Sequence, residues 1–502
     1  MKLCDLICDI EYFTKNKGID NIEIDRLCYD SRKAQTNSLF VCLKGVRSDG
    51  HAYVNNAYEL GCRCFIAQDK VSLPQDAVVL YTDDTRIALA KVSAAFFNYP
   101  SGRLMLIGVT GTKGKTSTSL MIADVMNKNG IRTGYIGSNG VIFDDFFCET
   151  VNTTPESYEL NYYFDKMLSA GIKVAVVEVS SQALYLNRVC SLTFDYCIFT
   201  NLSEDHIGGC EHPTFEHYKA CKMSLLTNYG AHTIIYNADD DTAAEIQEIT
   251  KGKRQFTFGI SNESADYKAR NIRLARRDYC LGVDFECVHG DTVQEVSLCT
   301  PGKFSVSNAL AAITLCSCLG IDIKQSSMAL KNAKIKGRFE VIRSLPGIPV
   351  VIDYAHNKVS MREALNALRE YKPNRIICVF GSVGNRTFIR RQELGEVVSE
   401  LADLAVITSD NPGTEPPEEI IDDIAVTFLT GKCPFVKITD RTDAIDYALN
   451  EAKTGDIVLL AGKGHETYQL IGYRKVPFSE LDIVEKVAEE ILDKQSELIL
   501  DI

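Results

Sequence analysis

Several features are missing from this sequence of 502 residues, and each absence excludes a class of protein. No apolar run reaches about 18 residues, the length that a membrane-spanning helix needs, so we expect no membrane insertion. The start, MKLCDLICDIEYFTKN, has acidic residues inside its apolar stretch and fits no secretory signal. Basic residues are fewer than acidic ones, which gives a net charge of −13, so nucleic acid and anionic membranes are poor partners. Anionic substrates remain possible, because local lysines, arginines and helix N-termini bind them.

The spacing C-x-x-C is also absent, although the chain has 18 cysteines. Most of them lie in apolar segments such as RIICVFG and ITLCSCLG. This placement favours buried, reduced thiols over a disulfide framework or a metal site. We therefore expect a cytoplasmic protein.

The chain is long enough for about three domains of the usual ~150 residues. Residues 1–98 combine the strand NSLFVCLKG, the helix VNNAYELGC and the strand CRCFIAQ, which predicts a small α/β domain. The stretch NYPSGR at 98–103 has the composition of a linker. We place the domain boundaries at 1–100, 101–336 and 337–502.

The middle segment alternates buried strands with helices. LMLIGVT, KVAVVEVS, DYCIFTNLS and HTIIYN are apolar runs typical of parallel strands, which predicts βαβ units on a twisted sheet. The segments RQFTFGI, CLGVDFECVHG and TVQEVSLCT, within residues 253–300, are expected to form antiparallel hairpins. From Gly337 the alternation resumes with IPVVIDYA, RIICVFGS, LAVITSD and DIVLLAG, which predicts a second doubly wound domain.

The stretch GVTGTKGKTSTS, residues 108–119, resembles a phosphate-binding loop with one glycine missing. The usual pattern is G-x-x-x-x-G-K-[ST], and here Val109 stands where its first glycine belongs. Lys115 and Thr116 still follow a strand and open a helix. Backbone N–H groups and Lys115 can therefore bind phosphates there, and the Thr116 hydroxyl can hold Mg²⁺.

Two further side chains fall at carboxyl ends of predicted parallel strands, the ligand edge of such a sheet. Glu178 ends one strand in VVEVSS, and His206 follows another in TNLSEDHIG. Together they can hold a second metal ion, although a residue of either kind alone is more often structural.

Ten motifs in this order resemble the Mur ligases: GTKGKTS, NTTPES, EVSSQAL, TNLSEDH, YKACKMSLL, NALAAI, GRFE, DYAH, DNP and GKGHE. The first domain, with YDSRKAQTNSLFVCLKGVRSDGHAY, is similar to the UDP-binding domain of that family. The resemblance covers nearly the whole chain. It implies an α/β fold of three domains: a small UDP-binding domain, a central doubly wound ATPase-like domain with a parallel sheet, and a Rossmann-like C-terminal domain.

The resemblance points to the family members that add the third residue of the peptidoglycan stem peptide. It implies an ATP-dependent amide ligase that activates the D-Glu γ-carboxylate of UDP-MurNAc-L-Ala-D-Glu as an acyl phosphate, which a diamino acid then attacks. The chain would be a cytoplasmic monomer using Mg²⁺. The resemblance also explains the missing glycine of the phosphate-binding loop, because these ligases use the pattern G-T-x-G-K-[ST].

The resemblance assigns roles residue by residue. Thr116, Glu178, His206 and Lys222 would hold Mg²⁺, with Lys222 carbamylated by CO₂, although its helical context alone favours a solvated lysine. ATP would contact the loop and three later residues: Gly111, Thr112, Lys113, Gly114, Lys115, Thr116, Ser117, Asn308, Arg338 and Asp353. The UDP-linked dipeptide would contact Ser31, Asn152, Thr153, Thr154, Ser180 and Arg188. His356 is expected to have a structural or nucleotide-side role rather than to act as general base.

The amino-acid site would contain Arg386, Asp410, Asn411, Gly413, Gly462 and Glu466. Family members that use meso-diaminopimelate carry D-N-P-R, whose arginine binds the far carboxylate, whereas this chain has Gly413 there. The missing charge favours L-lysine, then ornithine, with meso-diaminopimelate as the alternative. In favour of diaminopimelate, Arg386, Gly462 and Glu466 are kept, and Arg390 or Arg391 could replace the missing arginine.

Two other functions compete with this one. A folylpolyglutamate synthetase shares the central fold but would lack the UDP-binding first domain. A non-catalytic Mur-like paralogue would have lost Lys115, Glu178, His206 or Lys222, and all four are present.

Overall fold

The computed structural model describes residues 1–45, 48–205, 207–208, 211–277, 280–385, 388–429, 431 and 433–500, with backbone alone at 495 and 497–500. The chain forms two compact units, residues 1–266 with 311–321 and residues 267–310 with 322–502. Within the described residues no helix is both long and apolar enough to cross a membrane.

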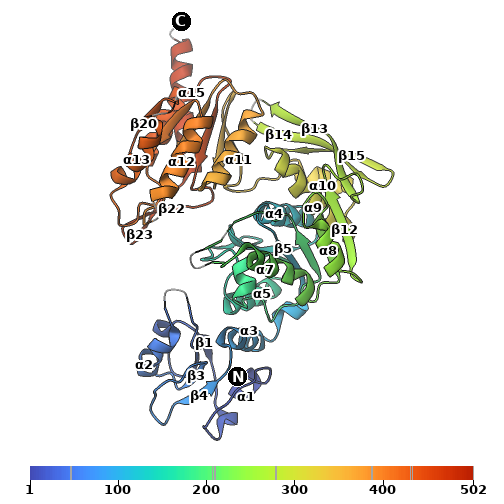
Figure 1. The fold of residues 1–502 in the computed structure, drawn as a ribbon, viewed down its shortest axis with the longest axis vertical. Coiled ribbons are helices and arrows are strands. Elements are labelled where there is room, and N and C mark those ends of the chain that lie inside the picture. The colour runs from blue at the N-terminus through green and yellow to red at the C-terminus, as the bar shows by residue number, and fades with distance from the viewer. Residues whose placement is uncertain are drawn as a thin grey trace. The chain divides into compact units, whose positions relative to one another are not determined.

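The first unit opens with a parallel sheet in the order β1-β2-β3-β4 (Figure 1). Its strands are β1 (Arg26–Cys28), β2 (Ser38–Val41), β3 (Cys64–Ala67) and β4 (Val78–Tyr81). The principal helices are α2 (Val54–Glu59) and α3 (Thr85–Phe96), with α1 (Leu3–Leu6) at the start. Asp84 caps α3 by accepting hydrogen bonds from the Arg86 and Ile87 N–H groups, which would otherwise lack partners. The small α/β domain predicted from the sequence is present, and it includes two strands and a long helix that we had not predicted.

The predicted linker at residues 98–103 contains a short helical turn. Pro100–Arg103 form a short 3₁₀ helix, and both Pro100 and Ser101 are buried. Proline fits this position because its fixed φ suits the first helical turn.

The larger sheet of this unit runs β12-β11-β10-β5-β9-β6, all parallel, and continues into antiparallel β7 and β8. The strands are β5 (Met105–Thr110), β6 (Thr133–Gly137), β7 (Gly140–Phe143), β8 (Phe146–Cys148), β9 (Val174–Glu178), β10 (Tyr196–Phe199), β11 (Thr233–Asn237) and β12 (Arg254–Gly259). The helices are α4 (Lys115–Lys128), α5 (Ser157–Ser169), α6 (Ser181–Tyr185), α7 (Phe215–Asn228) and α8 (Ala243–Ile249). The predicted parallel sheet is therefore confirmed.

One sequence-based expectation was wrong here. RQFTFGI was expected in an antiparallel hairpin, but β12 pairs in parallel with β11. Its register, Ile235 opposite Phe256, extends the doubly wound sheet by one strand. A short apolar run does not by itself distinguish a parallel strand from an antiparallel one.

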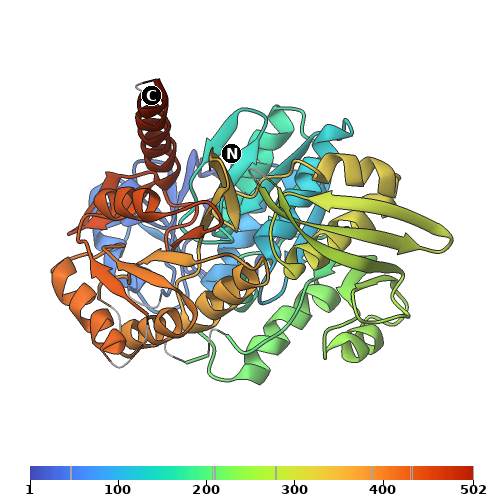
Figure 2. The ribbon, with the colours of Figure 1, turned by 90° about the horizontal axis from the view of Figure 1, so that it is seen from above.

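The second unit begins with a long antiparallel ribbon formed by β13 (Tyr267–Arg277), β14 (Cys280–His289) and β15 (Thr292–Leu298), coloured yellow-green in Figure 2. The predicted hairpins are confirmed for these residues. Helix α9 (Lys303–Cys318) follows, starting in the second unit and ending in the first, and then α10 (Ile323–Leu330).

The second unit ends with a six-stranded sheet in the order β16-β17-β21-β18-β19-β20, parallel except for the edge pair β16 and β17. Its strands are β16 (Glu340–Leu345), β17 (Ile348–Asp353), β18 (Ile376–Phe380), β19 (Leu404–Ile407), β20 (Phe435–Lys437) and β21 (Ile457–Ala461). A separate hairpin consists of β22 (Tyr468–Ile471) and β23 (Arg474–Pro477).

Helices cover both faces of this sheet, as the doubly wound prediction required. Alternate strand residues, such as Cys378 and Val379 on β18, belong to two different cores. One core contains residues of α11 (Lys358–Arg369), α12 (Phe388–Leu401) and α13 (Pro417–Ala425). The other contains residues of α14 (Arg441–Glu451) and α15 (Glu480–Leu500). The alternation follows from the two-residue period of a strand.

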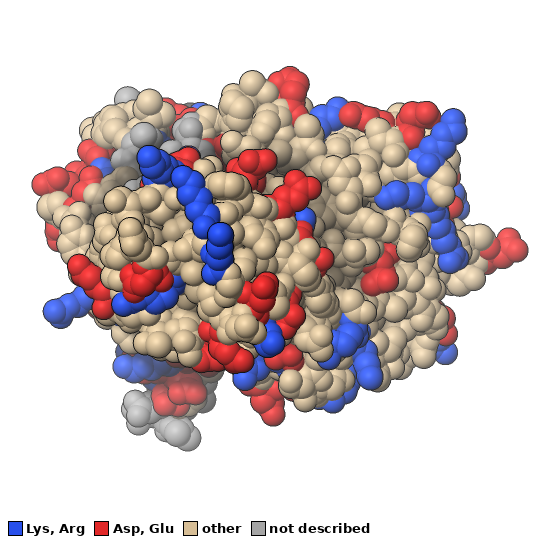
Figure 3. All heavy atoms as spheres, turned by 90° about the horizontal axis from the view of Figure 1, so that it is seen from below, with Lys and Arg blue, Asp and Glu red and all other residues tan. Residues whose placement is uncertain are grey.

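Charged side chains of both signs are interspersed on the face drawn in Figure 3. Several exposed charged side chains of the described residues form pairs, such as Arg273 with Glu295 and Lys437 with Asp422. Such exposed pairs contribute little to stability, because water and salt screen them.

Candidate active site

The phosphate-loop motif forms the strand, turn and helix that its sequence predicts. Strand β5 ends at Thr110, and α4 begins at Lys115. Gly111 has a φ of 144° and Gly114 a φ of 81°, in the region that favours glycine. A Cβ on Gly111 would lie 1.9 Å from the Thr200 hydroxyl oxygen, so the turn has no room for a side chain there.

The side chain of Lys115 lies over the phosphate-binding loop. Its ammonium donates to the carbonyl oxygens of Gly111 at 2.8 Å and Thr112 at 3.0 Å. Asn201, just after β10, accepts from the Lys113 N–H at 2.9 Å and holds the loop in place. The loop is therefore shaped by its own chain, with a cation and helix N–H groups at the same place, which suits a phosphate.

Glu178 and Thr116 meet at the carboxyl edge of the sheet, as predicted. Glu178 is fully buried, and its Oε2 accepts from the Thr116 hydroxyl at 3.0 Å. Its Oε1 accepts from the Tyr135 hydroxyl and, at 3.0 Å, from the Ser138 N–H. A buried carboxylate beside a hydroxyl offers the oxygen donors that Mg²⁺ prefers, so these residues fit that ion.

Tyr135 and Ser138 were missed by the sequence analysis. They lie at and after β6, and no motif marks them. Only the sheet order, which puts β6 beside β9, brings them to Glu178.

Lys222 is not a solvated helix lysine. It is 1 % exposed, and its ammonium donates to the Gly111 carbonyl oxygen at 2.7 Å. Burial, together with the nearby charge of Lys115, lowers the pKa of Lys222 well below its usual value. The structure therefore brings Lys115, Thr116, Glu178 and Lys222 to one loop. His206, predicted as a metal ligand, lies outside the described residues.

Four residues predicted to bind the UDP-linked dipeptide lie together next to Glu178. The Thr154 hydroxyl donates to the Glu178 carbonyl oxygen at 2.7 Å and accepts from the Ser180 N–H at 3.0 Å. Arg188 donates to the Thr154 carbonyl oxygen at 3.0 Å, and Thr153 shares a 3.0 Å hydroxyl contact with Ser138.

The other two predicted contacts of that substrate lie elsewhere in the first unit. Asn152 is exposed, and Ser31 is buried at the start of a short 3₁₀ helix. Glu156, which the sequence analysis missed, accepts from Arg188 at 2.9 Å and pairs with Arg86 at 3.3 Å. Its carboxylate joins α3 of the small sheet's domain to the loop before α5.

In the second unit the predicted nucleotide residues Arg338 and Asp353 lie beside Tyr354. The Arg338 guanidinium stands 4.7 Å from the centre of the Tyr354 ring. The Asp353 carboxylate accepts from the N–H groups of Phe339 and Ala355, both at 2.9 Å, and burial raises its pKa. Asn308 is buried on α9.

His356, next in the same segment, shares a 2.7 Å hydrogen bond between its Nδ1 and the Tyr354 carbonyl oxygen. Burial lowers the pKa of His356 below its usual value, so the ring is neutral near pH 7. Its predicted structural or nucleotide-side role stays a prediction.

The motifs DNP and GKGHE form one buried polar network. The Lys463 ammonium is fully buried and lies 3.0 Å from Asn411 Oδ1, 2.9 Å from Glu466 Oε2 and 3.6 Å from Asp410 Oδ1. Gly462 has a φ of 109°, and a Cβ there would lie 2.6 Å from an Asp410 carboxylate oxygen. The sequence analysis named four of these five residues and missed Lys463, whose place inside GKGHE was the available signal.

Gly413 lies at the end of this network, with a φ of 61°. Its N–H donates to the Leu470 carbonyl oxygen at 2.9 Å, and its own carbonyl accepts from the Gly472 N–H at 2.6 Å. These bonds join the DNP loop to the β22–β23 hairpin. Arg386, predicted for this site, lies outside the described residues.

The contacts of Arg391 count against its use as a replacement for the missing arginine, while the suggestion for Arg390 stays a prediction. Arg391 is 5 % exposed, with its guanidinium 2.5 Å from Glu415 and 2.8 Å from Asp423. Arg390 donates to the His356 carbonyl oxygen at 3.1 Å. Freeing Arg391 would leave two carboxylates without their cation, which is costly in a partly buried place.

Comparisons with known proteins agree with this geometry. Three family descriptions match in chain order: "Mur ligase family, catalytic domain" at residues 23–106, "Mur ligase middle domain" at 109–316 and "Mur ligase, glutamate ligase domain" at 337–464. The three-domain α/β architecture is thus the one expected, while the boundaries at 100/101 and 336/337 stay a prediction.

Two curated relatives are named UDP-N-acetylmuramoyl-L-alanyl-D-glutamate--2,6-diaminopimelate ligase. The one from Caldanaerobacter subterraneus subsp. tengcongensis is 40% identical over 98% of this chain and 99% of its own length. The one from Clostridium acetobutylicum, numbered 1 in its name, is 38% identical over 98% of this chain and all of its own length.

A solved structure of a protein with the same name superposes with a TM-score of 0.68 at 25% identity, over 98% of this chain and 99% of that one. The similarity thus runs through all three domains, including the first, which a folylpolyglutamate synthetase was expected to lack. Together, the matches show that this chain belongs to the Mur ligase family, as an ATP-dependent ligase of peptidoglycan synthesis.

Proposed function

We propose that this ligase joins 2,6-diaminopimelate to the D-Glu γ-carboxylate of UDP-MurNAc-L-Ala-D-Glu. The observation that carries the proposal is the 40% identity, over 98% of the chain, to a relative named for that reaction. Our sequence-based preference for L-lysine rested on one residue, Gly413. The relatives support the alternative that we had ranked second.

The chemistry proceeds in two displacements. A γ-carboxylate oxygen attacks the γ-phosphorus of ATP, and ADP leaves. The amine of the incoming amino acid then attacks the acyl carbon, loses a proton and expels phosphate. The first displacement brings anions together, so a site that performs it must be cationic.

Lys115 supplies the protein's cation for this step. It lies at the N-terminus of α4, where the helix N–H groups also face an anion. Its present bonds to Gly111 and Thr112 keep the ammonium over the loop, where the β- and γ-phosphates would lie.

Thr116 and Glu178 are the residues that would hold Mg²⁺, with His206 and Lys222 as the further ligands that the family resemblance implies. When bound, the ion neutralises phosphate charge during transfer. Glu178 keeps its place because Tyr135 and the Ser138 N–H bind one oxygen, while the Thr116 hydroxyl binds the other.

Carbamylation of Lys222 fits the surroundings of its side chain. CO₂ reacts with a neutral amine, and burial beside Lys115 lowers the pKa of Lys222 in the direction that yields one. Once formed, the carbamate is an anion next to Lys115, so the charge repulsion that lowers the amine's pKa becomes an attraction.

The Lys463 network would bind the amino acid. Asp410 and Glu466 supply carboxylates for an ammonium group, while Asn411 bridges Lys463 and Glu466. Asp410 and Glu466 together carry two negative charges, and the buried Lys463 carries one positive charge. The remaining negative charge suits the additional ammonium group of a diamino acid.

The test is a reaction of the purified enzyme with UDP-MurNAc-L-Ala-D-Glu, ATP and one amino acid at a time, with ADP and tripeptide both measured. We expect product with meso-diaminopimelate at a kcat/KM at least about tenfold above that with L-lysine or ornithine. Product with lysine alone would overturn the amino-acid assignment, and no product with any diamino acid would overturn the proposed reaction.

A further inference from the structure

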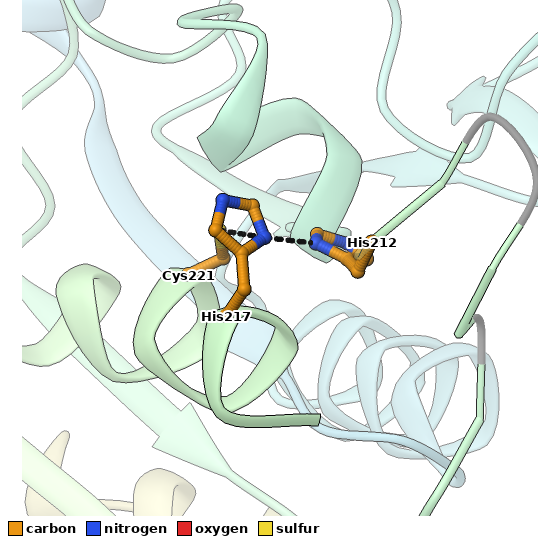
Figure 4. Close-up of side chains that lie close together, drawn as sticks. All are labelled: His212, His217 and Cys221. Carbon is orange, nitrogen blue, oxygen red and sulfur yellow. Dashed lines mark hydrogen bonds between the residues drawn. The ribbon is translucent and has the colours of Figure 1, made fainter. Parts of the chain in front are cut away.

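A second cluster of possible metal ligands lies in the first unit, on the loop before α7 and on α7 itself. His212, His217 and Cys221 are spaced H-x₄-H-x₃-C, and His217 and Cys221 are one helical turn apart (Figure 4). Each offers a ligand atom, and these three atoms lie within 4.8 Å of one another. None of the three has a role in the proposed ligation.

The distances suit a common ion. Nδ1 of His212 is 2.9 Å from Nδ1 of His217, which in turn is 3.9 Å from the Cys221 sulfur. A tetrahedral Zn²⁺ with bonds of about 2.0–2.1 Å to nitrogen and about 2.3 Å to sulfur would separate two nitrogens by about 3.3 Å and a nitrogen from sulfur by about 3.6 Å. Metal binding would require the two rings to move apart by about 0.4 Å, and the ion would replace their present hydrogen bond.

The surroundings orient the His212 ring as a metal site does. The Nε2 of His212 is 2.9 Å from the Ser181 hydroxyl oxygen, which turns Nδ1 toward His217. A ligating histidine usually has its other nitrogen fixed by such an oxygen partner. The ring of Tyr185 packs against both histidines, with ring centres 6.0 Å from His212 and 4.9 Å from His217. His212 is 1 % exposed, so the cluster is shielded from water on that side.

We propose that His212, His217 and Cys221 bind a thiophilic transition-metal ion of the Zn²⁺ class, at a site separate from Thr116 and Glu178. The two imidazoles bind through Nδ1. The Cys221 thiol releases its proton to solvent as the sulfur–metal bond forms, so one proton leaves for each ion bound. Nitrogen and sulfur donors select against Mg²⁺, which prefers oxygen. Three protein ligands leave a fourth position for water.

The site joins two segments that would frame the ligation chemistry. His212 belongs to the loop that follows β10, and Cys221 directly precedes Lys222 on α7. An ion held by both would hold the start of α7 against that loop.

Co²⁺ is the probe, because its spectrum reports both thiolate ligation and tetrahedral geometry. The full-length protein, stripped with a chelator and kept reduced, is titrated with Co²⁺ in excess Mg²⁺. We expect one equivalent to produce a thiolate-to-cobalt charge-transfer band and intense visible d–d bands, which Zn²⁺ then abolishes. Absence of the charge-transfer band from the wild-type protein would overturn the proposal.

Substitutions test whether the charge-transfer band comes from His212, His217 and Cys221. Cys221→Ser removes the charge-transfer band, whereas Cys8→Ser, at an exposed thiol, keeps it. His217→Gln keeps a weakened thiolate band and lowers Co²⁺ affinity at least about tenfold. Ser181→Ala keeps the band and weakens binding about 10- to 100-fold, because only the orientation of His212 is lost. A band of unchanged strength in folded Cys221→Ser, or unchanged affinity in folded His217→Gln, would show that the metal binds elsewhere.

Discussion

Lys115 is the residue on which the phosphate-loop assignment depends. Lys115→Ala removes an ammonium group that the structure places over the loop, and such a contact contributes about 3 kcal/mol or more to the transition state. We therefore expect kcat to fall by roughly 10²-fold or more, measured as ADP release. Lys128→Ala is the matched control, because Lys128 ends the same helix and pairs with Asp124 on the surface. Near-normal turnover of Lys115→Ala would refute the assignment.

Lys222 gives the second prediction at this scale. Because burial lowers the pKa of its amine and so favours the neutral form that reacts with CO₂, Lys222 should carry a carbamate, and Lys222→Ala should be nearly inactive. A small added carboxylate should restore part of the activity by replacing the missing anion. Lys219→Ala, one turn earlier and paired with Glu245 near the surface, should stay active. Full wild-type activity in CO₂-free buffer, with no added mass on Lys222, would contradict the carbamate.

Cys299 is predicted to be an unusually acidic thiol. A hydrogen bond from Cys280, with the guanidinium groups of Arg343 and Arg277 nearby, lowers the pKa of Cys299 to about 6. Its thiolate should therefore form as pH rises through about 6, and alkylation by iodoacetamide, followed by mass spectrometry, should reach half its maximal rate there. Arg343→Gln removes a donor 3.3 Å from the sulfur and should move the midpoint upward, whereas exposed Arg362→Gln should not. A midpoint above pH 8 in the wild-type protein would rule this out.

At the scale of elements, α14 and α15 are joined by a buried ion pair. Arg441 donates to Glu480 Oε1 at 2.9 and 2.7 Å, and neither side chain is more than 2 % exposed. Arg441→Met leaves a buried carboxylate without its cation, which typically costs about 3–5 kcal/mol of unfolding free energy. Urea denaturation should show that loss, while Arg362→Met, which breaks an exposed pair with Glu400, should cost under about 1 kcal/mol. Equal effects of the two substitutions would mean that the buried pair is not what joins these helices.

Elements with a strong local pattern were predictable from sequence, and elements defined by their partners were not. Strand β5, the turn at Gly111 and helix α4 follow from an apolar run, glycines and helical spacing. The parallel pairing of β12 could not be predicted in this way. Its six residues do not show whether the neighbouring strand runs in the same direction or the opposite one. The same holds for Tyr135, Ser138 and Glu156, whose contacts depend on elements distant in sequence.

For the whole molecule, the motifs favoured lysine as the third amino acid, whereas the curated relatives are named for diaminopimelate. Asp410, Asn411, Gly462 and Glu466 were named from sequence and do lie together around Lys463. The preference for lysine gave the missing arginine at Gly413 more weight than the retained Arg386, Gly462 and Glu466. Similarity over the full length weighs many positions at once, and it supports diaminopimelate.

The consequence of Gly413 for the choice of substrate can be measured directly. Gly413→Arg supplies a guanidinium where the family's D-N-P-R pattern has one, and a bidentate bond to the far carboxylate contributes about 2–5 kcal/mol. The substitution has a cost of about 1–2 kcal/mol, because φ is 61° there. Its Cβ would also lie 2.9 Å from the Asn385 amide nitrogen, at the end of a side chain that can move.

We expect the ratio of kcat/KM for meso-diaminopimelate to that for L-lysine to rise at least about tenfold in Gly413→Arg. Gly413→Gln carries the same backbone strain without the charge, so it should lower both values and leave their ratio near that of the wild type. A ratio that rises equally in the glutamine variant would exclude the charge as the cause. An unchanged ratio in Gly413→Arg would mean that the far carboxylate does not bind beside residue 413, and that this enzyme recognises it from another part of the site.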